Sequence, residues 1–158
     1  MNANAKRISI IASTFNEFLV NSMIESSIQT FKEHGYDEEL IDIIRVPGAF
    51  EIPLMAKKIA LSGDYKVIVA LGAIVRGATP HFDFIAAETT SALMKVGLDN
   101  MIPIGFGILT CDTMEQAIER SGTGAGNKGH EAALAAVEMI KAMTVSYTHL
   151  TLPTIYSV

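Results

Sequence analysis

The hydrophobic residues of this chain gather in four short runs rich in β-branched side chains, and a stretch with helical spacing follows each run. A parallel strand needs a long crossover connection, usually a helix, before the next parallel strand can begin. The alternation therefore predicts an α/β domain with a parallel sheet. The predicted strands are Ile8–Ala12, Leu40–Val46, Lys66–Leu71 and Met101–Leu109.

Helix boundaries are predicted from residues that start or stop helices. The first helix is expected to begin near Asn16, a common N-cap residue, and to stop at Gly35. Pro53 fits the first turn of a second helix that runs through Ile59 and closes at Gly63. The other predicted helices are Phe82–Val96, closed by Gly97, then Thr113–Arg120 and Glu131–Met143. Because crossovers are right-handed, these elements favour a three-layer α/β/α sandwich with a four-stranded parallel sheet and a site at the carboxyl ends of its strands.

Residues 144–158 do not continue this pattern. Beyond Thr144 the sequence VSYTHLTLPTIYSV has no acidic or basic residue other than His149, and Pro153 excludes a continuous helix. We therefore assign a single domain to residues 1–143. The tail of residues 144–158 is interpreted as an appended, non-native segment, an edge strand, or an arm that reaches a neighbouring subunit.

Length, charge and cysteine content narrow the class of protein. The 158 residues suffice for one hydrophobic core, and no apolar run reaches the roughly 18 residues that span a membrane. The formal net charge of −5 argues against a broad nucleic-acid surface. The polar start before Lys6 does not resemble a secretion signal, and the single cysteine, Cys111, cannot form an internal disulfide. We expect a cytoplasmic protein that binds neither nucleic acid nor membrane.

Neither thiol chemistry nor metal binding is indicated. Cys111 has no histidine near it in sequence, and packing is the more common role of a lone cysteine beside a strand end. The histidines show no paired ligand spacing, so no metal is expected. They are His34, His81, His130 and His149.

One glycine-rich segment, Gly124-Ala-Gly126-Asn-Lys-Gly129, formally matches the dinucleotide fingerprint G-x-G-x-x-G. That fingerprint follows a strand and opens a helix early in a βαβ unit, whereas this segment follows a predicted helix late in the chain. A phosphate-binding P-loop is not supported either, because Lys128 is followed by Gly129 instead of Ser or Thr. Nucleotide binding is therefore not predicted.

The loops after the first two predicted strands carry aromatic and acidic side chains. Phe15 follows the first strand, where its ring could stack on a flat heterocycle or, alternatively, staple onto the next helix. After the second strand, two prolines bracket Ala49, Phe50 and Glu51 in a stiff loop. The loop ends at a helix N-terminus whose unpaired N–H groups can bind ligand oxygens, although Glu51 could simply favour the helix dipole.

The loop after the third predicted strand, residues 72–83, has the densest polar cluster. The backbone N–H groups of Gly77, Ala78 and Thr79 could hold an anion near the start of the third helix. His81 lies next to them, and histidine is the side chain suited to moving protons at neutral pH. Taken alone, a histidine in a first helical turn is more often a surface residue or a cap.

Together these segments resemble the lumazine synthase family in order and spacing. The matching segments are FN after the first strand, VPGAFEIP after the second, GAIVRGATPHFDF after the third, then GFGILT and QAIERSGTGAGNKG. The resemblance covers roughly Lys6–Met143, and RGATPHFD and AGNKG are its most specific parts. It implies a flavodoxin-like fold and an enzyme that condenses 5-amino-6-ribitylaminouracil with 3,4-dihydroxy-2-butanone 4-phosphate. The products would be 6,7-dimethyl-8-ribityllumazine, phosphate and water, formed without cofactor or metal.

The resemblance also implies roles for individual residues. His81 would move protons, Arg120 and the Gly77–Thr79 backbone would bind phosphate, and Lys128 would add positive charge nearby. Arg120 could instead suit the dipole at a helix C-terminus, and Lys128 could simply be solvated. The remaining implied contacts to the pyrimidine and its ribityl chain come from Phe15, Asn16, Ala49, Phe50, Glu51, Ala73, Ile74 and Phe106.

By the same resemblance each site would be shared between two subunits of a pentamer, with Phe106, Arg120 and Lys128 supplied by the neighbour. Pentamers, decamers and sixty-subunit shells occur in the family, and riboflavin synthase is a possible partner. Gly124 stands where a lysine is common, and the chain departs from the family pattern after Met143. Two alternatives stay open: a non-catalytic binder of flavin or lumazine, and a shell-forming protein with a vestigial pocket.

Overall fold

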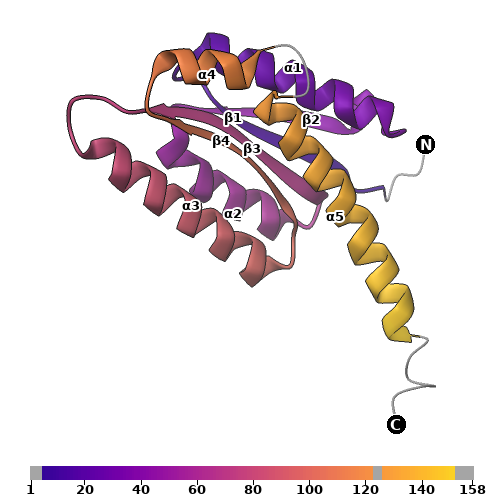
Figure 1. The fold of residues 1–158 in the computed structure, drawn as a ribbon. Helices are drawn as coiled ribbons and strands as arrows, with labels where there is room; N and C mark the ends of the chain where they lie inside the picture. The colour runs from indigo at the N-terminus through magenta and orange to yellow at the C-terminus, as the bar shows by residue number, and fades with distance from the viewer. Residues whose placement is uncertain (1–4, 123–125, 152–158) are drawn as a thin grey trace.

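The computed structural model of the chain describes residues 5–122 and 126–151, with side chains through residue 145. Helices and strands alternate along it (Figure 1). The elements in order are β1 (Arg7–Ser13), α1 (Glu17–Glu33), the 3-10 turn η1 (Glu38–Leu40), β2 (Ile41–Val46), the 3-10 turn η2 (Ala49–Glu51), α2 (Ile52–Ser62), β3 (Tyr65–Val75), α3 (His81–Asn100), β4 (Ile104–Cys111), α4 (Met114–Ser121) and α5 (Lys128–Thr151).

The four strands form one parallel sheet in the order β2-β1-β3-β4. Helices α1, α4 and α5 cover one face of the sheet, and α2 and α3 cover the other (Figure 1). This arrangement confirms the predicted three-layer α/β/α sandwich of the flavodoxin-like kind. No helix in the described ranges is long and apolar enough to cross a membrane.

Alternation along β1 divides the core between the two faces. Ile8 and Ile10 are fully buried against α1 and α5, whereas Ile11 is fully buried on the side of α2 and α3. A parallel sheet covered on both faces buries successive side chains in opposite directions, so its strands read as continuous apolar runs. This explains why the strands are visible in the sequence as such runs.

A polar cluster joins the amino ends of three strands. The Arg7 guanidinium donates to the Asp42 carboxylate at 2.6 and 2.8 Å and to the Glu39 carbonyl at 2.7 Å. The Tyr65 hydroxyl donates to the same carboxylate at 2.8 Å. The hydrogen bond from Arg7 is the main cause that holds the pKa of Asp42 below its ordinary value. The cluster therefore ties β1, β2 and β3 together at the end of the sheet opposite the predicted site.

Several strand boundaries differ from the sequence prediction, two of them in β2 and β3. Strand β3 continues beyond Leu71 to Val75, because its ladder with β4 extends to the pair Val75 and Cys111. Ala73 and Ile74 are therefore strand residues and not part of the following loop. Strand β2 begins at Ile41, since Leu40 belongs to the preceding 3-10 turn.

Helix α3 is longer than predicted, and Gly97 does not end it. The helix runs to Asn100 and stops at Met101, which adopts the left-handed conformation with φ 51°. A Cβ at Gly97 would lie 3.2 Å from the Ile102 carbonyl oxygen, so this glycine permits close approach of the chain that returns to β4. The fourth strand consequently starts at Ile104, three residues later than predicted.

The last helix is also longer than predicted. Helix α5 begins at Lys128 and reaches Thr151, beyond the expected end at Met143. Its final turns project past the sheet (Figure 1). The backbone of residues 144–151 is therefore helical, so the edge-strand interpretation of this part of the tail is wrong. Pro153 lies outside the described residues.

Candidate active site

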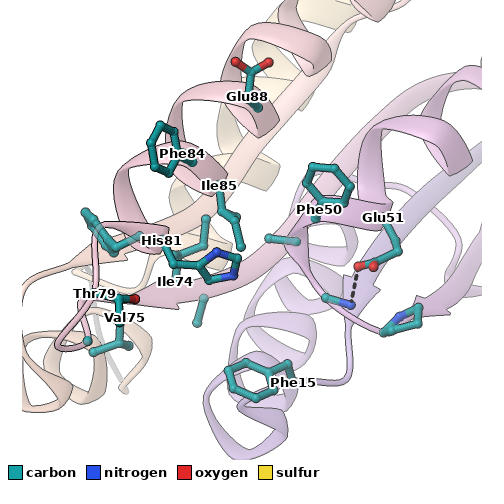
Figure 2. A pocket seen from close by; sticks show the side chains of 16 residues that line it. Phe15, Phe50, Glu51, Ile74, Val75, Thr79, His81, Phe84, Ile85 and Glu88 are labelled. Carbon is teal, nitrogen blue, oxygen red and sulfur yellow. Dashed lines mark hydrogen bonds between the residues drawn. The ribbon is translucent and has the colours of Figure 1, made fainter.

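A cavity of about 710 Å³ opens at the carboxyl ends of the strands. Three connections contribute to it, β1–α1, β2–α2 and β3–α3. In Figure 2 the side chains of Phe15, Phe50 and His81 stand around the same space although each comes from a different element. Its walls are lined by Phe15, Pro47, Gly48, Ala49, Phe50, Glu51, Ala73, Ile74, Val75, Gly77, Thr79, His81, Phe82, Phe84, Ile85 and Glu88. The structure thus brings together nine predicted site residues: Phe15, Ala49, Phe50, Glu51, Ala73, Ile74, Gly77, Thr79 and His81.

Phe15 is held by its backbone while its ring stays free. The Phe15 N–H donates to the Pro47 carbonyl at 3.0 Å, and the Thr14 N–H donates to the Val46 carbonyl at 2.8 Å. These bonds join the β1–α1 loop to the β2–α2 loop. The side chain is 69% exposed at the cavity wall, so it does not staple onto α1.

Asn16 holds the expected position before α1 but does not act as an ordinary N-cap. It has left-handed backbone angles, φ 57° and ψ 48°, and its side chain makes no capping bond. Its amide reaches the Ala73 carbonyl at 3.4 Å instead. Asn16 therefore links the β1–α1 loop to the end of β3 from behind the cavity wall, and it is not among the lining residues.

The β2–α2 connection is a tight turn that presents one aromatic ring. The Gly48 N–H donates to the Glu51 carboxylate at 3.0 Å, as the dashed line in Figure 2 marks. Ala49 is buried, and the Phe50 side chain is 62% exposed at the cavity. Glu51 thus stabilises the turn before α2, a role that the helix-terminus interpretation anticipated only in part.

The predicted anion loop lies between β3 and α3. Gly77 and Thr79 line the cavity, whereas Ala78 does not. Helix α3 begins at His81, after Pro80, and no side chain caps its N-terminus. Its first N–H groups therefore carry the partial positive charge that favours an anion. The His81 ring points toward the middle of the cavity in Figure 2.

Most of one cavity wall was not predicted from the sequence, where only His81 was assigned to the site. His81, Phe84, Ile85 and Glu88 all line it and follow one another at helical spacing on α3. This periodicity was visible in the sequence as an i, i+3, i+4, i+7 pattern. Nothing in the pattern says, however, that this face of the helix stays uncovered.

The other three predicted residues form a separate cluster. The Lys128 ammonium lies 5.8 Å from the centre of the Phe106 ring and 3.9 Å from the Glu131 carboxylate. Arg120 pairs with the same carboxylate at 3.3 Å. None of the three predicted residues lines the cavity of this chain. Phe106, Arg120 and Lys128 thus lie near one another around the end of α4, the start of α5 and β4, with Arg120 exposed and the other two half-buried.

Two glycines determine how β4 carries Phe106. Cβ atoms at Gly105 and Gly107 would overlap the Ala132 carbonyl of α5 and the Leu71 side chain of β3, respectively. The face of β4 that bears these glycines is therefore covered directly by α5. Phe106 projects from the opposite face, on the side of α2 and α3.

Cys111 shows no sign of nucleophilic activation. The residue is 7% exposed at the end of β4, and burial raises the pKa of its thiol. A raised pKa lowers the thiolate fraction that reacts or binds metals. The packing role predicted for this cysteine is consistent with these observations.

The fold and this cavity indicate an α/β protein that binds small molecules at the edge of its sheet. An open cavity with aromatic and polar side chains at the carboxyl ends of parallel strands is the usual small-molecule site of an open α/β sheet. The family model for 6,7-dimethyl-8-ribityllumazine synthase matches residues 5–144. The chain belongs to this family.

Relatives named 6,7-dimethyl-8-ribityllumazine synthase are similar over most of the chain. Those from Prosthecochloris aestuarii and Pelodictyon phaeoclathratiforme are each 51% identical over 140 residues. The relative from Nitratidesulfovibrio vulgaris is 50% identical over 141 residues. Each alignment covers 89% of this chain and 90% of the relative. The family match over residues 5–144 includes the cavity and the separate cationic cluster.

Proposed function

We propose that this chain condenses 5-amino-6-ribitylaminouracil with 3,4-dihydroxy-2-butanone 4-phosphate to give 6,7-dimethyl-8-ribityllumazine, phosphate and water. The observation that supports this proposal most directly is the convergence of Phe15, Phe50 and His81 on one cavity beside the anion loop. An aromatic heterocycle and a phosphate ester are the two kinds of ligand that such walls suit. Family membership supplies the identity of both substrates.

The proposed chemistry asks for positioning and proton transfer. The amine of the pyrimidine attacks the ketone, water leaves as the imine forms, phosphate is eliminated, and ring closure releases a second water. Phe15 would stack on the pyrimidine, and Ala49, Phe50 and Glu51 would hold its edge and ribityl chain. His81 would carry protons between these steps. No enzyme nucleophile is required, because holding two reactants together can by itself remove much of a barrier.

The charge of the cavity supports a contribution from a second subunit. Among the described residues, its lining includes Glu51 and Glu88 but neither lysine nor arginine. A phosphate monoester needs cations, which make shorter and stronger hydrogen bonds than neutral donors. Arg120 is exposed and Lys128 half-buried elsewhere on the same chain. We therefore assign them, with Phe106, to the cavity of a neighbouring copy in a pentamer.

An apolar surface next to Phe106 supports such self-association. A groove of about 570 Å³ lies between α3, β4 and α5, and Phe106 is part of its lining. Met94, Leu98 and Met101 are each more than 60% exposed there. Apolar patches of this kind mark interaction sites. Assembly of pentamers into larger shells, association with riboflavin synthase and a cytoplasmic location are further parts of this proposal.

A direct assay tests the activity. The two substrates are mixed with purified protein, and lumazine fluorescence is followed against the uncatalysed background. We expect saturable turnover that the His81→Ala variant slows. Binding of lumazine without turnover would favour the non-catalytic alternative. Sedimentation of the same preparation tests the assembly, and a monomer that turns over at full rate would exclude the shared site.

A further inference from the structure

Arg76 connects three parts of the molecule behind the anion loop. Its Nε donates to the Asp112 carboxylate at 2.8 Å, in the β4–α4 connection. Its two terminal nitrogens donate to the Asp83 carboxylate at 3.3 and 3.2 Å, in the first turn of α3. Its guanidinium carbon also lies 4.3 Å from the centre of the Phe82 ring. These contacts place one side chain between β3, α3 and β4.

The contacts of Arg76 span both ends of the anion loop. Arg76 itself follows the last residue of β3, and its N–H donates to the Cys111 carbonyl at 2.8 Å. Asp83 lies just after the loop on α3. The ion pair therefore closes the segment that contains Gly77, Thr79 and His81. Phe82, which lines the cavity, is fixed from behind by the same guanidinium.

This arrangement needs the shape of arginine as well as its charge. A planar guanidinium can make two parallel bonds to one carboxylate, bond a second through Nε and stack on an aromatic face. A lysine ammonium is a point charge and cannot make all of these contacts at once. Isolated exposed ion pairs contribute little, whereas bidentate networks can hold a fixed geometry.

We propose that Arg76 is a positioning residue, which holds the Gly77–Thr79 backbone and His81 in the geometry that binds and processes the phosphate substrate. The inference rests on the proposed function. Arg76 is not among the residues that line the cavity, and its charge is directed at two carboxylates. It acts on the reaction through the loop that it closes.

Substitution of Asp83 distinguishes a positioning role of Arg76 from a direct effect of charge on phosphate binding. Removing a negative charge near a phosphate site should strengthen phosphate binding if charge alone mattered. Removing it should weaken binding if the Arg76 to Asp83 ion pair positions the loop. Asp83→Asn is nearly isosteric and leaves the arginine in place. The two explanations therefore predict opposite changes in the phosphate affinity of Asp83→Asn.

The experiment compares Arg76→Gln, Arg76→Lys and Asp83→Asn with Lys95→Gln as a matched control. Lys95 forms an exposed i,i+4 pair with Asp99 toward the other end of the same helix. KM and kcat are measured for each substrate, and inorganic phosphate binding is titrated by calorimetry. Circular dichroism and the thermal midpoint report whether each variant is folded.

We expect Arg76→Gln and Asp83→Asn to raise KM for the sugar phosphate about tenfold, with KM for the pyrimidine nearly unchanged. Arg76→Lys should recover part of the loss, and Lys95→Gln should match the wild type. Tighter phosphate binding by Asp83→Asn would overturn the positioning role. The positioning role would also be overturned if the variants lost only kcat, in proportion to their loss of thermal stability.

Failure of the proposed function can be recognised independently. If the wild type forms no lumazine, the activity is excluded, while the phosphate titration still compares the wild type with the variants. Weaker phosphate binding by both Arg76→Gln and Asp83→Asn would then support the positioning role. Absence of phosphate binding by the wild type would overturn the anion loop and its positioning residue together.

Discussion

The ammonium of Lys128 lies 5.8 Å from the centre of the Phe106 ring, although α5 covers one face of β4 and Phe106 projects from the other. Glu131 links the same ammonium to Arg120. A cation over an aromatic face is attracted to it, most strongly when water is excluded. The chain therefore presents an aromatic ring and two cations as one arranged group, at a distance from its own cavity.

If this group completes a neighbour's cavity, two impaired variants should restore one another. His81→Ala damages the cavity, and Arg120→Ala damages the cationic group. In mixed pentamers about a quarter of the interfaces would join an intact cavity to an intact cationic group. We expect lumazine formation by the mixture, after dissociation and reassembly, to exceed that of either variant alone. Activity that stays at the sum of the separate variants would place both residues in the same site of one chain.

Stacking on Phe15 should appear in the affinity for the pyrimidine substrate. Phe15→Ala removes an exposed ring from the cavity wall, and aromatic pairing contributes about 0.5–1.5 kcal/mol beyond area burial. We expect KM for the ribitylaminouracil to rise about three- to tenfold, with KM for the sugar phosphate little changed. Phe18→Ala is the matched control, because Phe18 is 62% exposed but does not line the cavity. Equal effects of both changes would refute the stacking role.

The Asp42 cluster should make part of the stability depend on pH. Arg7, by its hydrogen bond, and then Tyr65 lower the pKa of this carboxyl in the folded state. A lowered pKa stabilises the fold above the unfolded value of about 4, and the contribution is lost as pH falls through the folded pKa. We expect Asp42→Asn to lose about 1–2 kcal/mol at pH 7 and progressively less below pH 4 in urea unfolding.

The control for this experiment is Asp99→Asn, which removes only an exposed i,i+4 pair with Lys95. Such pairs contribute about 0.3–0.5 kcal/mol. An Asp42→Asn deficit that is the same at pH 7 and pH 3 would mean that the carboxylate charge is not the cause. The loss would then reflect packing around Tyr65.

The glycine-rich connector between α4 and α5, which runs into the first turn of α5, should be sensitive at Gly129 but not at Gly126. A Cβ at Gly129 would overlap the Met23 carbonyl oxygen of α1 and lie 2.7 Å from its Cα, whereas a Cβ at Gly126 would meet nothing within 4 Å. Overpacking of this kind costs about 1–3 kcal/mol or more. We expect Gly129→Ala to lower the thermal midpoint by several degrees, and Gly126→Ala to leave it nearly unchanged. Similar midpoints for both variants would show that α1 and α5 can move apart at no cost.

Asn127 should be the polar residue on which this connector depends. It is 2% exposed, donates to the carbonyls of Ser121 and Gly122 at 2.9 and 2.8 Å, and accepts from the Gly129 N–H at 2.7 Å. Asn127→Ala would leave these buried groups unpaired, at about 2–4 kcal/mol. Asn21→Ala, which removes a bond in an exposed region, is the control in the same thermal unfolding measurement. Equal stability of both variants would mean that water replaces the lost partners.

The sequence was most informative where one physical rule decides the structure. Strands buried on both faces read as apolar runs, and Pro53 and Gly63 marked the second helix correctly because each has a fixed backbone preference. Gly97 misled the prediction. A glycine that permits close packing and a glycine that ends a helix look the same in sequence, and only the position of Ile102 distinguishes them.

Some residues of the candidate site could likewise be predicted from the sequence and others could not. Loop residues with distinctive chemistry, such as Phe15 and His81, could be placed because parallel strands bring their carboxyl ends to one edge. Arg76 could not be assigned, since its role depends on Asp112, which is 36 residues away and reached only through the β3–β4 ladder. Phe84 and Glu88 escaped because helical periodicity does not reveal which stripe remains uncovered.

The glycines on one face of β4 determine how far the Lys128 side chain reaches toward Phe106. A Cβ at Gly105 would overlap the carbonyl of Ala132, one turn beyond Lys128, so a methyl group there would push the start of α5 away from the sheet. The Lys128 ammonium can reach around the strand to Phe106 only while α5 stays packed against β4. Because the strand has no side chain at this position, α5 packs directly on it, and this packing determines where the Lys128 ammonium lies relative to a neighbouring copy.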